Sequence, residues 1–542
     1  MDETQRSSAC TPGIIVTPKK LFLFIIIIII LSGLLHLFLY GYINITISTN
    51  FPSVRYIREY STIGNATHII TEHGTHSAGS DILARLQNSI PVTNLTQEMY
   101  DRAFLWRGNT AKLKKIFRDA IVKKRPISMA TIGGSVSAGG GVKASCEFPC
   151  LHMEILAEWL RTVLGVRVES RNVAMSGANS ELYGYCLDAH VDAESTDILI
   201  GELSTNDRLS FSQPGFKERG RPFEEVIRNT KMHREKPVFI SAGFIDSRLL
   251  ILELTNGHNC SFDLEQNYYK PLLKYYDITG VSLHRVVCPV YGLQPGFRML
   301  DVIGFDLFHP GLLSHRYVAI ILMKFFAGII EGTLKSLEVV DPPEPSLPTP
   351  LYNSTWITNP VCFTNTRHVH PRSSSNQSWA EMIKSNISIP VKYDNLRAIE
   401  MKGFHKFFSN SSMRRYEKYD IMEHRNDVMD GYQGNKVGDW ITMELVASGK
   451  PPGSVQQVLS VAYVTCDSCD LAVISVWLGI HEKPISPVFN FKTVAGSAGV
   501  IIMPIDGLNL SDYVKEHQVF NVTMKLNWDY NFLLHTVMIA WR

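Results

Sequence analysis

Residues 126–142 read Pro-Ile-Ser-Met-Ala-Thr-Ile-Gly-Gly-Ser-Val-Ser-Ala-Gly-Gly-Gly-Val. The apolar run Ile127–Ile132 predicts a buried strand that stops at Gly133 and Gly134, and Ser135 follows directly. Because glycine lets the backbone turn sharply, we expect the Ser135 hydroxyl to lie exposed at the carboxyl end of this strand. Open α/β sheets bind their ligands at that edge. Ser135 is therefore a candidate functional residue.

Apolar runs alternate with helical patterns from this stretch onward. We predict buried strands at 127–132, 166–173, 197–203, 237–244 and 281–287, and helices at 150–164, 181–191, 222–233, 267–276 and 312–337. Strands and helices that alternate at this spacing are typical of a parallel sheet with helices on both faces. The sequence predicts an α/β domain over residues 101–338.

A second domain is expected after a proline-rich segment. Five prolines fall within residues 340–350, so we predict an extended linker at 339–350. Residues 351–435 are polar and hard to assign. Seven β-rich runs then follow, at 440–446, 455–465, 471–478, 488–493, 499–505, 520–526 and 532–541. Short runs of this kind predict an all-β sandwich or jelly-roll-like domain over 351–542.

The N-terminal part contains an apolar segment, Leu21–Tyr40, with no acidic or basic residue. Twenty helical residues at ~1.5 Å rise span a hydrocarbon core of ~30 Å. A cleaved signal peptide is the alternative, but its apolar region is usually about 7–15 residues and ends in a small-residue cleavage site. We therefore expect one N-terminal transmembrane helix at 21–42.

Positive charges set the expected orientation of this helix. Arg6, Lys19 and Lys20 precede it, whereas residues 41–54 carry no positive charge. The positive-inside rule places residues 1–20 in the cytosol as a short tail and residues 43–100 outside it as a luminal stem. The expected protein is a single-pass type II membrane protein of the Golgi, another secretory compartment or the cell surface.

Sequons and cysteines fit an oxidising compartment. Eight cysteines follow the membrane segment, an even number that predicts disulfides without revealing their pairing. Cys466 and Cys469 have metal-ligand spacing, but no second pair accompanies them, so a local disulfide or free thiols are favoured and no metal site is predicted. Ten sequons, which chance can also produce, are candidate glycosylation sites: Asn44, Asn65, Asn94, Asn259, Asn353, Asn376, Asn386, Asn410, Asn509 and Asn521.

Three later segments could serve a site around Ser135. Residues 172–180 place Gly177 after the second predicted strand, where its N–H could face a ligand, although a plain turn is the simpler interpretation. Asn206 follows the third strand and could donate a side-chain hydrogen bond or cap a helix. Asp306 and His309 lie three residues apart before the last long helix, so the carboxylate could orient the imidazole.

Together, the four segments resemble the SGNH (GDSL-type) hydrolase family over about residues 120–338. Residues 133–135 match its Gly-Asp-Ser loop with Gly134 in place of Asp, and residues 172–177 match its Asn-x-x-x-Ser-Gly block. Residues 204–207 keep the Asn of its Gly-x-Asn-Asp block but have Ser204 in place of Gly. Asp306 and His309 match its Asp-x-x-His block.

The resemblance implies a three-layer, flavodoxin-like α/β/α fold and acyl transfer without a cofactor. Ser135 would attack an ester carbonyl, and His309, held by Asp306, would take its proton. The N–H groups of Ser135 and Gly177 and the Asn206 amide would form the oxyanion hole. Ser137 is a lower-ranked nucleophile because it does not follow the glycine pair. Residues 139–144 fit neither a phosphate-binding nor a dinucleotide-binding glycine loop.

The sequence therefore predicts a membrane-anchored ester hydrolase or O-acyltransferase acting on acylated, for instance acetylated, glycans. Lipid or other carboxyl esters are an alternative substrate class. A catalytically inactive glycan-binding or adhesion protein is an alternative function, and a receptor has little support. A net charge of +2, from 53 basic and 51 acidic residues, gives no reason to expect nucleic acid as a partner. Nothing in the sequence predicts an oligomeric state.

Overall fold

The computed structural model describes most of the chain after residue 73, all of it within one compact unit, His73–Arg542. The described residues are 74–142, 146, 149–192, 195–210, 220–232, 237–245, 247, 250–251, 260, 265–337, 346–352, 358–364, 393–407, 413–416, 421–424, 431–465, 473–492, 499–528 and 532–541. The predicted tail, membrane helix, Cys466, Cys469 and seven of the ten sequons lie outside them.

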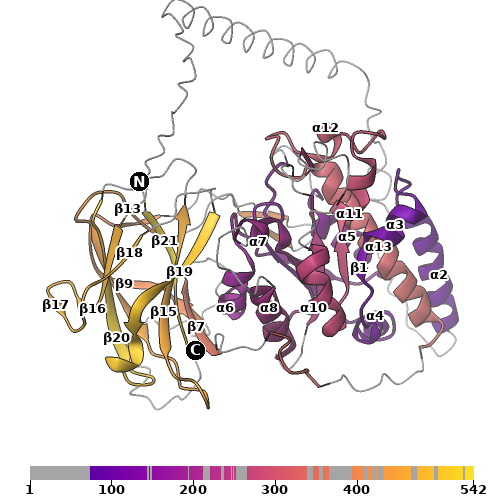
Figure 1. The fold of residues 1–542 in the computed structure, drawn as a ribbon. Coiled ribbons are helices and arrows are strands. Elements are labelled where there is room, and N and C mark those ends of the chain that lie inside the picture. The colour runs from indigo at the N-terminus through magenta and orange to yellow at the C-terminus, as the bar shows by residue number, and fades with distance from the viewer. Residues whose placement is uncertain are drawn as a thin grey trace, which may run out of the picture. The chain divides into compact units, whose positions relative to one another are not determined.

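In Figure 1 helices surround the sheet of the first described domain. This sheet has six strands in the order β1-β6-β5-β4-β2-β3. All neighbouring pairs are parallel except β1 with β6, which is antiparallel. The strands are β1 (Phe104–Trp106), β2 (Ile127–Gly133), β3 (Val168–Asn172), β4 (Ile198–Glu202), β5 (Val238–Gly243) and β6 (Gly280–Ser282). The α/β prediction is thus confirmed, with an antiparallel edge strand added.

Helices cover both faces of this sheet because residues of each strand alternate between two cores. In β2, Ile127 and Met129 join one core, while Ala130 and Ile132 join the other. The first core is completed by α4 (Ala111–Lys123), α5 (His152–Leu164) and α13 (Leu312–Leu334). The second contains residues of α6 (Ser180–His190), α8 (Arg221–Met232) and α10 (Lys270–Tyr275).

Among the described helices, α13 alone has the length and apolar composition to cross a membrane, and 72% of its most apolar window is buried inside the protein. Its side chains pack against α4 and α5 in the first core. It is therefore the core helix that the sequence predicts at 312–337.

Two predictions for this domain need correction. Residues 281–287 were expected to form a strand, but the strand ends at Ser282 and α11 (Leu283–Val287) follows, because the Ser282 hydroxyl caps the helix by accepting from Arg285 N at 3.4 Å. The predicted stem also extends too far. α2 (Gly74–Ser89) and α3 (Gln97–Ala103) place Ile82 and Met99 in the first core.

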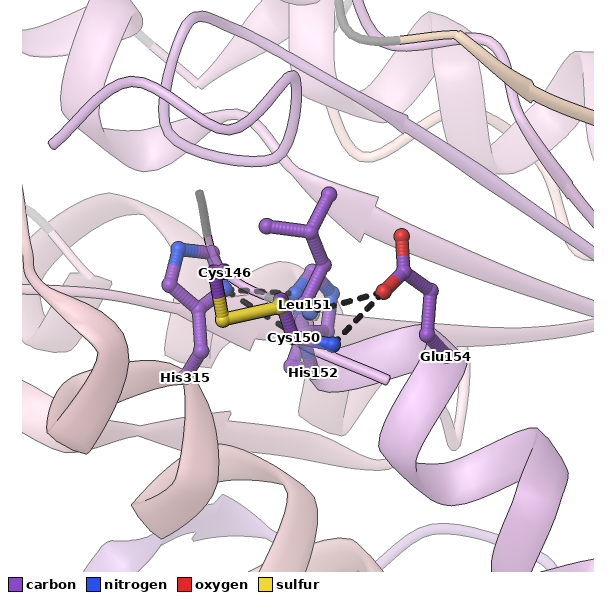
Figure 2. The surroundings of a disulfide bond; sticks show 6 residues. All are labelled: Cys146, Cys150, Leu151, His152, Glu154 and His315. Carbon is purple, nitrogen blue, oxygen red and sulfur yellow. Dashed lines mark hydrogen bonds between the residues drawn. A yellow bond between two sulfur atoms is a disulfide. The ribbon is translucent and has the colours of Figure 1, made fainter. Parts of the chain in front are cut away.

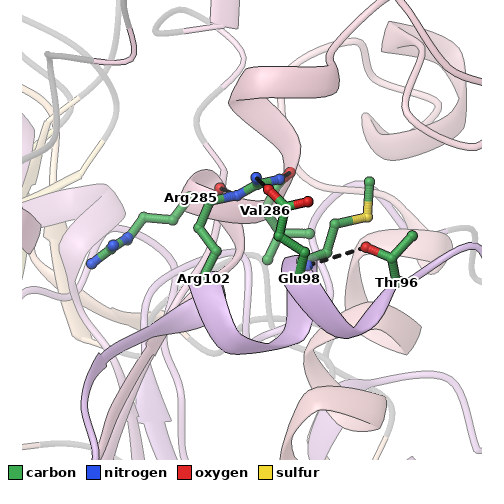
Figure 3. Close-up of polar contacts among 6 residues, drawn as sticks. Thr96, Glu98, Arg102, Arg285 and Val286 are labelled. Carbon is green, nitrogen blue, oxygen red and sulfur yellow. Dashed lines mark hydrogen bonds and ion pairs between the residues drawn. The ribbon is translucent and has the colours of Figure 1, made fainter.

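Figure 3 shows how α3 is fastened to α11. Arg102 donates from Nε to Arg285 O at 2.8 Å and from Nη2 to Val286 O at 3.4 Å, and pairs with Glu98 at 3.3 Å. The hydroxyl of Thr96 caps α3 by accepting from Met99 N at 3.2 Å. Arg102 thus ties α3 to α11 through two distant backbone carbonyls, contacts that the sequence does not reveal.

The second domain is a sandwich of two sheets, as predicted, and their strand pairs are antiparallel except for β7 with β8, which is parallel. Its interior holds alternate residues of facing strands, such as Ile441 and Met443 of one sheet and Leu459 and Val461 of the other. One sheet has the order β10-β13-β21-β15-β19, with β7 beside β21, and the other β17-β16-β20-β14-β9, with β18 beside β16.

The strands of the first of these sheets are β7 (Thr358–Thr364), β8 (Tyr393–Asn395), β10 (His405–Phe407), β13 (Gly431–Gly434), β15 (Gln457–Thr465), β19 (Gly499–Asn509) and β21 (Phe532–Trp541). Those of the second are β9 (Arg397–Lys402), β14 (Trp440–Val446), β16 (Val473–Ile480), β17 (Lys483–Pro484), β18 (Phe489–Lys492) and β20 (Val519–Leu526). A separate hairpin joins β11 (Met413–Tyr416) and β12 (Ile421–His424). All seven predicted β-rich runs correspond to strands.

The sandwich shares a core with the α/β domain. Ala462, Met538 and Ala540, which face away from the sandwich interior, are buried in the second core together with residues of α6. A disulfide joins Cys186 of α6 to Cys362 of β7. The two domains are therefore held together by buried apolar side chains and a covalent bond.

Residues 346–352, which include the described end of the predicted linker (339–350), lie against the α/β domain. The buried Glu224 carboxylate on α8 accepts from Leu351 N at 2.6 Å and from Tyr352 N at 3.1 Å. Arg228 donates to Pro348 O at 2.7 Å. An extended, proline-rich backbone leaves these groups available, so this part of the linker is bound along α8.

Candidate active site

Ser135 lies in a tight turn after β2, as its glycine pair predicts. Gly134 N donates to Glu202 O at the end of β4 at 3.3 Å, and Ala138 N donates to Gly134 O at 3.0 Å. A Cβ at residue 134 would overlap Asn206 Nδ2. Gly134, which replaces the Asp of the SGNH pattern, therefore leaves room for the Asn206 amide.

Asp306 and His309 are carried by a short loop between α12 (Met299–Val302) and α13. The loop closes on itself because Gly304 N donates to His309 O at 2.6 Å. Asp306 Oδ1 accepts from the N–H of Phe308 at 3.0 Å and from that of His309 at 2.9 Å. The carboxylate thus organises the backbone that presents the imidazole.

The structure brings Ser135, His309 and Asp306 into one hydrogen-bonded chain. Ser135 Oγ donates to His309 Nε2 at 2.8 Å, and His309 Nδ1 donates to Asp306 Oδ2 at 2.6 Å. Burial opposes ionisation of Asp306, but the hydrogen bonds from the His309 side chain and the two backbone N–H groups outweigh it and lower its pKa. An ionised Asp306 holds the proton on Nδ1, which leaves Nε2 free to accept.

Gly177 and Asn206 meet beside Ala178. Gly177 has a φ of 74°, a left-handed conformation that favours glycine, and the turn leads to Asn179, whose side chain caps α6. Asn206 Nδ2 donates to Ala178 O at 2.8 Å, which directs the amide toward the segment that holds Gly177. The two predicted oxyanion donors are therefore on adjoining segments.

A buried network behind these donors was not predicted. Asp207 accepts from Ser180 N at 2.7 Å and from the hydroxyls of Ser180 and Tyr269. Burial raises the pKa of Asp207 to about 6. The network connects the start of α6 to α7 (Ser204–Ser210), the helix that carries Asn206. Tyr269 lies 62 residues beyond Asp207 in no recognisable motif, so the sequence offered no signal for it.

Ser204, the other departure from the SGNH pattern, also has a buried partner. Its hydroxyl donates to Glu265 Oε1 at 2.5 Å, and Glu265 lies in the π-helical turn Glu265–Tyr269. A glycine at residue 204 could not make this bond. The substitution therefore joins α7 to another element of the domain instead of disturbing the turn.

Ser137, the lower-ranked nucleophile, is fully buried. Its carbonyl accepts from Asn172 Nδ2 at 2.6 Å, which ties the Ser135 turn to the end of β3. Within the residues that the structure describes, no group of three or more His, Cys, Asp or Glu side chains could hold a metal ion.

Figure 2 shows the Cys146–Cys150 disulfide beside His152, Glu154 and His315. Cys150 packs with Val142 and Leu151 in a small buried cluster against which Leu312 also lies. Val142 follows the glycines of the Ser135 turn, and Leu312 begins α13 three residues after His309. The cluster therefore joins the segment after the serine to the segment after the histidine.

Two other disulfides are present in the described residues, Cys186–Cys362 and Cys260–Cys288. Six of the eight cysteines that follow the predicted membrane segment are thus paired, as their even number predicts. The pairing joins residues up to 176 positions apart, which spacing alone does not reveal.

A scan against protein-family models found no match, and neither did a search of curated proteins. Solved structures do resemble this chain. A two-domain esterase (CEX) active on acetylated mannans, co-crystallised with mannopentaose, is 16% identical with a TM-score of 0.51, and the alignment covers 82% of this chain and 98% of that chain.

Two further structures match a smaller share of this chain. The family 3 carbohydrate esterase of Clostridium thermocellum is 12% identical with a TM-score of 0.29, covering 38% of this chain and 98% of its own. A lipase/acylhydrolase from Enterococcus faecalis is 13% identical with a TM-score of 0.28, and the alignment covers 37% of this chain and 96% of that chain. The chain therefore shares the overall fold of the two-domain esterase, in which an α/β domain is joined to a β-rich domain.

Proposed function

We propose that this protein is a serine carboxyl-ester hydrolase that acts on acylated glycans. The observation that carries the proposal is the chain of hydrogen bonds from Ser135 through His309 to Asp306. An oriented imidazole that accepts from a serine hydroxyl is the arrangement that activates a serine for attack on an ester carbonyl. Ser135 lies near the start of the α/β domain sequence, whereas His309 and Asp306 lie near its end, and the fold brings the two loops together.

In the first step the Ser135 Oγ–C bond forms while the Ser135 proton passes to His309 Nε2. The charge that develops on the carbonyl oxygen is met by the N–H groups of Ser135 and Gly177 and by the Asn206 amide. His309 then gives its proton to the leaving alcohol as the C–O bond breaks. A water molecule repeats the sequence on the acyl-serine and releases the acid; a sugar hydroxyl in its place would make the protein an O-acyltransferase.

The substrate class is supported by the two-domain esterase with this fold, which acts on acetylated mannans. The N-terminal sequence predicts a membrane anchor and a secretory location. Both would place the site where glycans are made or displayed. Lipid esters remain the alternative substrate. An inactive glycan-binding protein is disfavoured because it has no need of a serine hydroxyl hydrogen-bonded to an oriented imidazole.

Hydrolysis of a short-chain aryl ester by the full-length chain, compared with Ser135→Ala, tests the proposal. We expect the variant to lose at least about 10³-fold in kcat while its thermal unfolding is unchanged. Ser137→Ala is the matched control, because that hydroxyl is buried and should not be needed for chemistry. Equal rates for Ser135→Ala and the unsubstituted protein would contradict the proposal that the protein is a serine esterase.

The substrate class needs its own measurement. Incubation of the active protein with acetylated mannan, with other acetylated glycans and with acylated lipids, followed by mass spectrometry, should show loss of acetyl groups from a glycan first. Added sugar acceptors would reveal acyl transfer as a gain in acceptor mass. Deacylation of lipids alone would replace the glycan proposal with its alternative.

A further inference from the structure

The loop that carries the catalytic pair also exposes three large apolar side chains. Phe305, Leu307 and Phe308 are 62%, 56% and 44% exposed, and we call these three residues the apolar rim. They surround Asp306 in sequence and end at His309. Soluble proteins rarely gather exposed apolar side chains in one place without a binding partner for them.

The backbone beneath the rim is fixed. Phe305 N donates to Gly141 O at 3.4 Å, Leu307 N donates to Gly304 O at 3.0 Å, and Asp306 holds the N–H groups that follow. The backbone of the rim therefore has a set position relative to His309. The ring of Phe308 meets that of His309 edge to face with centroids 4.8 Å apart.

Leu307 adopts a left-handed backbone conformation, with a φ of 59°. A leucine is strained in this conformation, which asparagine or glycine adopts more readily. Strain of this kind is usually found at functional sites. An exposed leucine at a strained position next to the catalytic carboxylate thus suggests a use for its side chain.

The direction of proton transfer shows which part of an ester would meet the rim. His309 Nε2 must come within about 2.6–3.2 Å of the leaving oxygen to protonate it. The carbonyl oxygen points instead toward Gly177 and Asn206, on other segments. The carbon atoms attached to the leaving oxygen therefore lie beside the imidazole, where Phe308 and its neighbours stand.

We propose that the apolar rim binds the leaving alcohol of the ester, and that this alcohol presents an apolar, C–H-rich face to Phe305, Leu307 and Phe308. A pyranose ring, whose axial C–H groups stack on aromatic rings, and an alkyl chain share this chemistry. The inference rests on the proposed ester hydrolysis and adds the side of the ester on which specificity is exerted.

A pair of isomeric esters tests the side directly. Hexyl acetate and ethyl hexanoate have the same atoms, but the apolar chain lies on the alcohol in the first and on the acyl group in the second. We expect the full-length protein to have the higher kcat/KM for hexyl acetate. Phe305→Ser and Leu307→Asn should each lower the ratio of the two kcat/KM values about 10-fold, the lower end of what one methylene in an apolar pocket contributes.

Asparagine suits the φ of residue 307, so Leu307→Asn removes the apolar side chain without adding backbone strain. Leu307→Met, which keeps an apolar side chain, should restore most of the ratio. Ile485→Asn is the matched control, because Ile485 is 59% exposed but belongs to the β-rich domain. Its ratio should equal that of the unsubstituted protein.

A second arm separates the two sources of an apolar alcohol. Methyl 6-O-acetyl-mannopyranoside and hexyl acetate are each compared with ethyl acetate, and the substrate whose preference falls further in Phe305→Ser shows whether the rim suits a sugar or an alkyl alcohol better. A preference for ethyl hexanoate, or ratios that neither rim variant changes, would overturn the inference. Neither result touches the proposed function, which fails only if Ser135→Ala is as active as the unsubstituted protein.

Discussion

Asp306 is the single residue on which the geometry of the site depends most. Its carboxylate accepts from the His309 ring and from two backbone N–H groups, and these bonds keep its pKa low. Asp306→Asn would place an amide where the ring N–H now donates and so favour the wrong tautomer of His309. We expect kcat for an acetate ester to fall about 10⁴-fold with little change in KM.

Steady-state kinetics at several pH values would check this prediction, with circular dichroism to confirm that the variant is folded. A fall of less than about tenfold would mean that the backbone, rather than the carboxylate, orients the imidazole.

The close approach of Gly134 to Asn206 leads to a second prediction for a single residue. A methyl group at this position would overlap Asn206 Nδ2, so Gly134→Ala should push the amide out of the oxyanion hole. The expected loss in kcat is about 10²–10³-fold, as for removal of the donor itself. Asn206→Ala and the double variant should show the same loss as Gly134→Ala, which transient kinetics of acylation would measure. If the losses in kcat of the two single variants added up in the double variant, Gly134→Ala would not act through Asn206.

The residues of the candidate site could be predicted from the sequence because each stands in a short block at the end of an element. Tyr269 and Glu265 were not, because their partners Asp207 and Ser204 lie about sixty residues away and a buried tyrosine or glutamate has no local signature. The role of Gly134 could not be predicted from the sequence either. A glycine is needed there because the folded chain places the Asn206 amide against it.

Helix α6 is the element that connects the site to the rest of the protein. It begins three residues after Gly177, is capped by Asn179, and is tied to β7 by the Cys186–Cys362 disulfide. A bond that closes a loop of 176 residues removes more disorder from the unfolded chain than one that closes a loop of four.

Replacement of Cys186 and Cys362 by Ala should therefore lower the free energy of unfolding by about 5 kcal/mol, against about 2 kcal/mol for the Cys146 and Cys150 pair, by the chain-entropy relation. Denaturant unfolding of the two double variants checks the order. Should the short-loop pair prove the more costly, packing around Val142 and Leu312 would outweigh chain entropy.

Elements with regular periodicity were predicted within a few residues, and those set by caps or distant contacts were missed. The run 281–287 is apolar enough for a strand, yet the hydroxyl of Ser282 starts a helix within it. The edge strand β1 is only three residues long, too short for any pattern to appear. Helices α2 and α3 bury few side chains each, so their sequences look like a stem.

For the molecule as a whole, buried carboxyl groups make stability depend on pH. Burial raises the pKa of Glu202 to about 7 from its ordinary 4.5, so the folded protein holds this proton more tightly than the unfolded chain. Its contribution to stability is fully present below about pH 4.5 and is lost as pH rises through about 7. Glu181 and Asp207, raised to about 7 and about 6, act in the same direction.

Glu202→Gln, which cannot ionise, should therefore show a smaller loss of stability between pH 5 and pH 8 than the unsubstituted protein. A tenfold difference in proton affinity between the folded and unfolded chain corresponds to about 1.4 kcal/mol. Thermal unfolding at both pH values measures the effect, with Glu482→Gln on an exposed turn of the β-rich domain as control. An identical pH dependence in Glu202→Gln and the control would assign the effect to other groups.

The segment bound along α8 has a consequence for how this chain can be divided or recombined. Glu224 is buried and uses both carboxylate oxygens to hold the backbone of Leu351 and Tyr352. A catalytic fragment that ended before residue 346 would lose these two backbone donors, leave Glu224 with the hydroxyl of Tyr276, and uncover the apolar side of α6. The two domains and the segment between them thus form one unit. An exchange of the β-rich domain between proteins would have to include that segment.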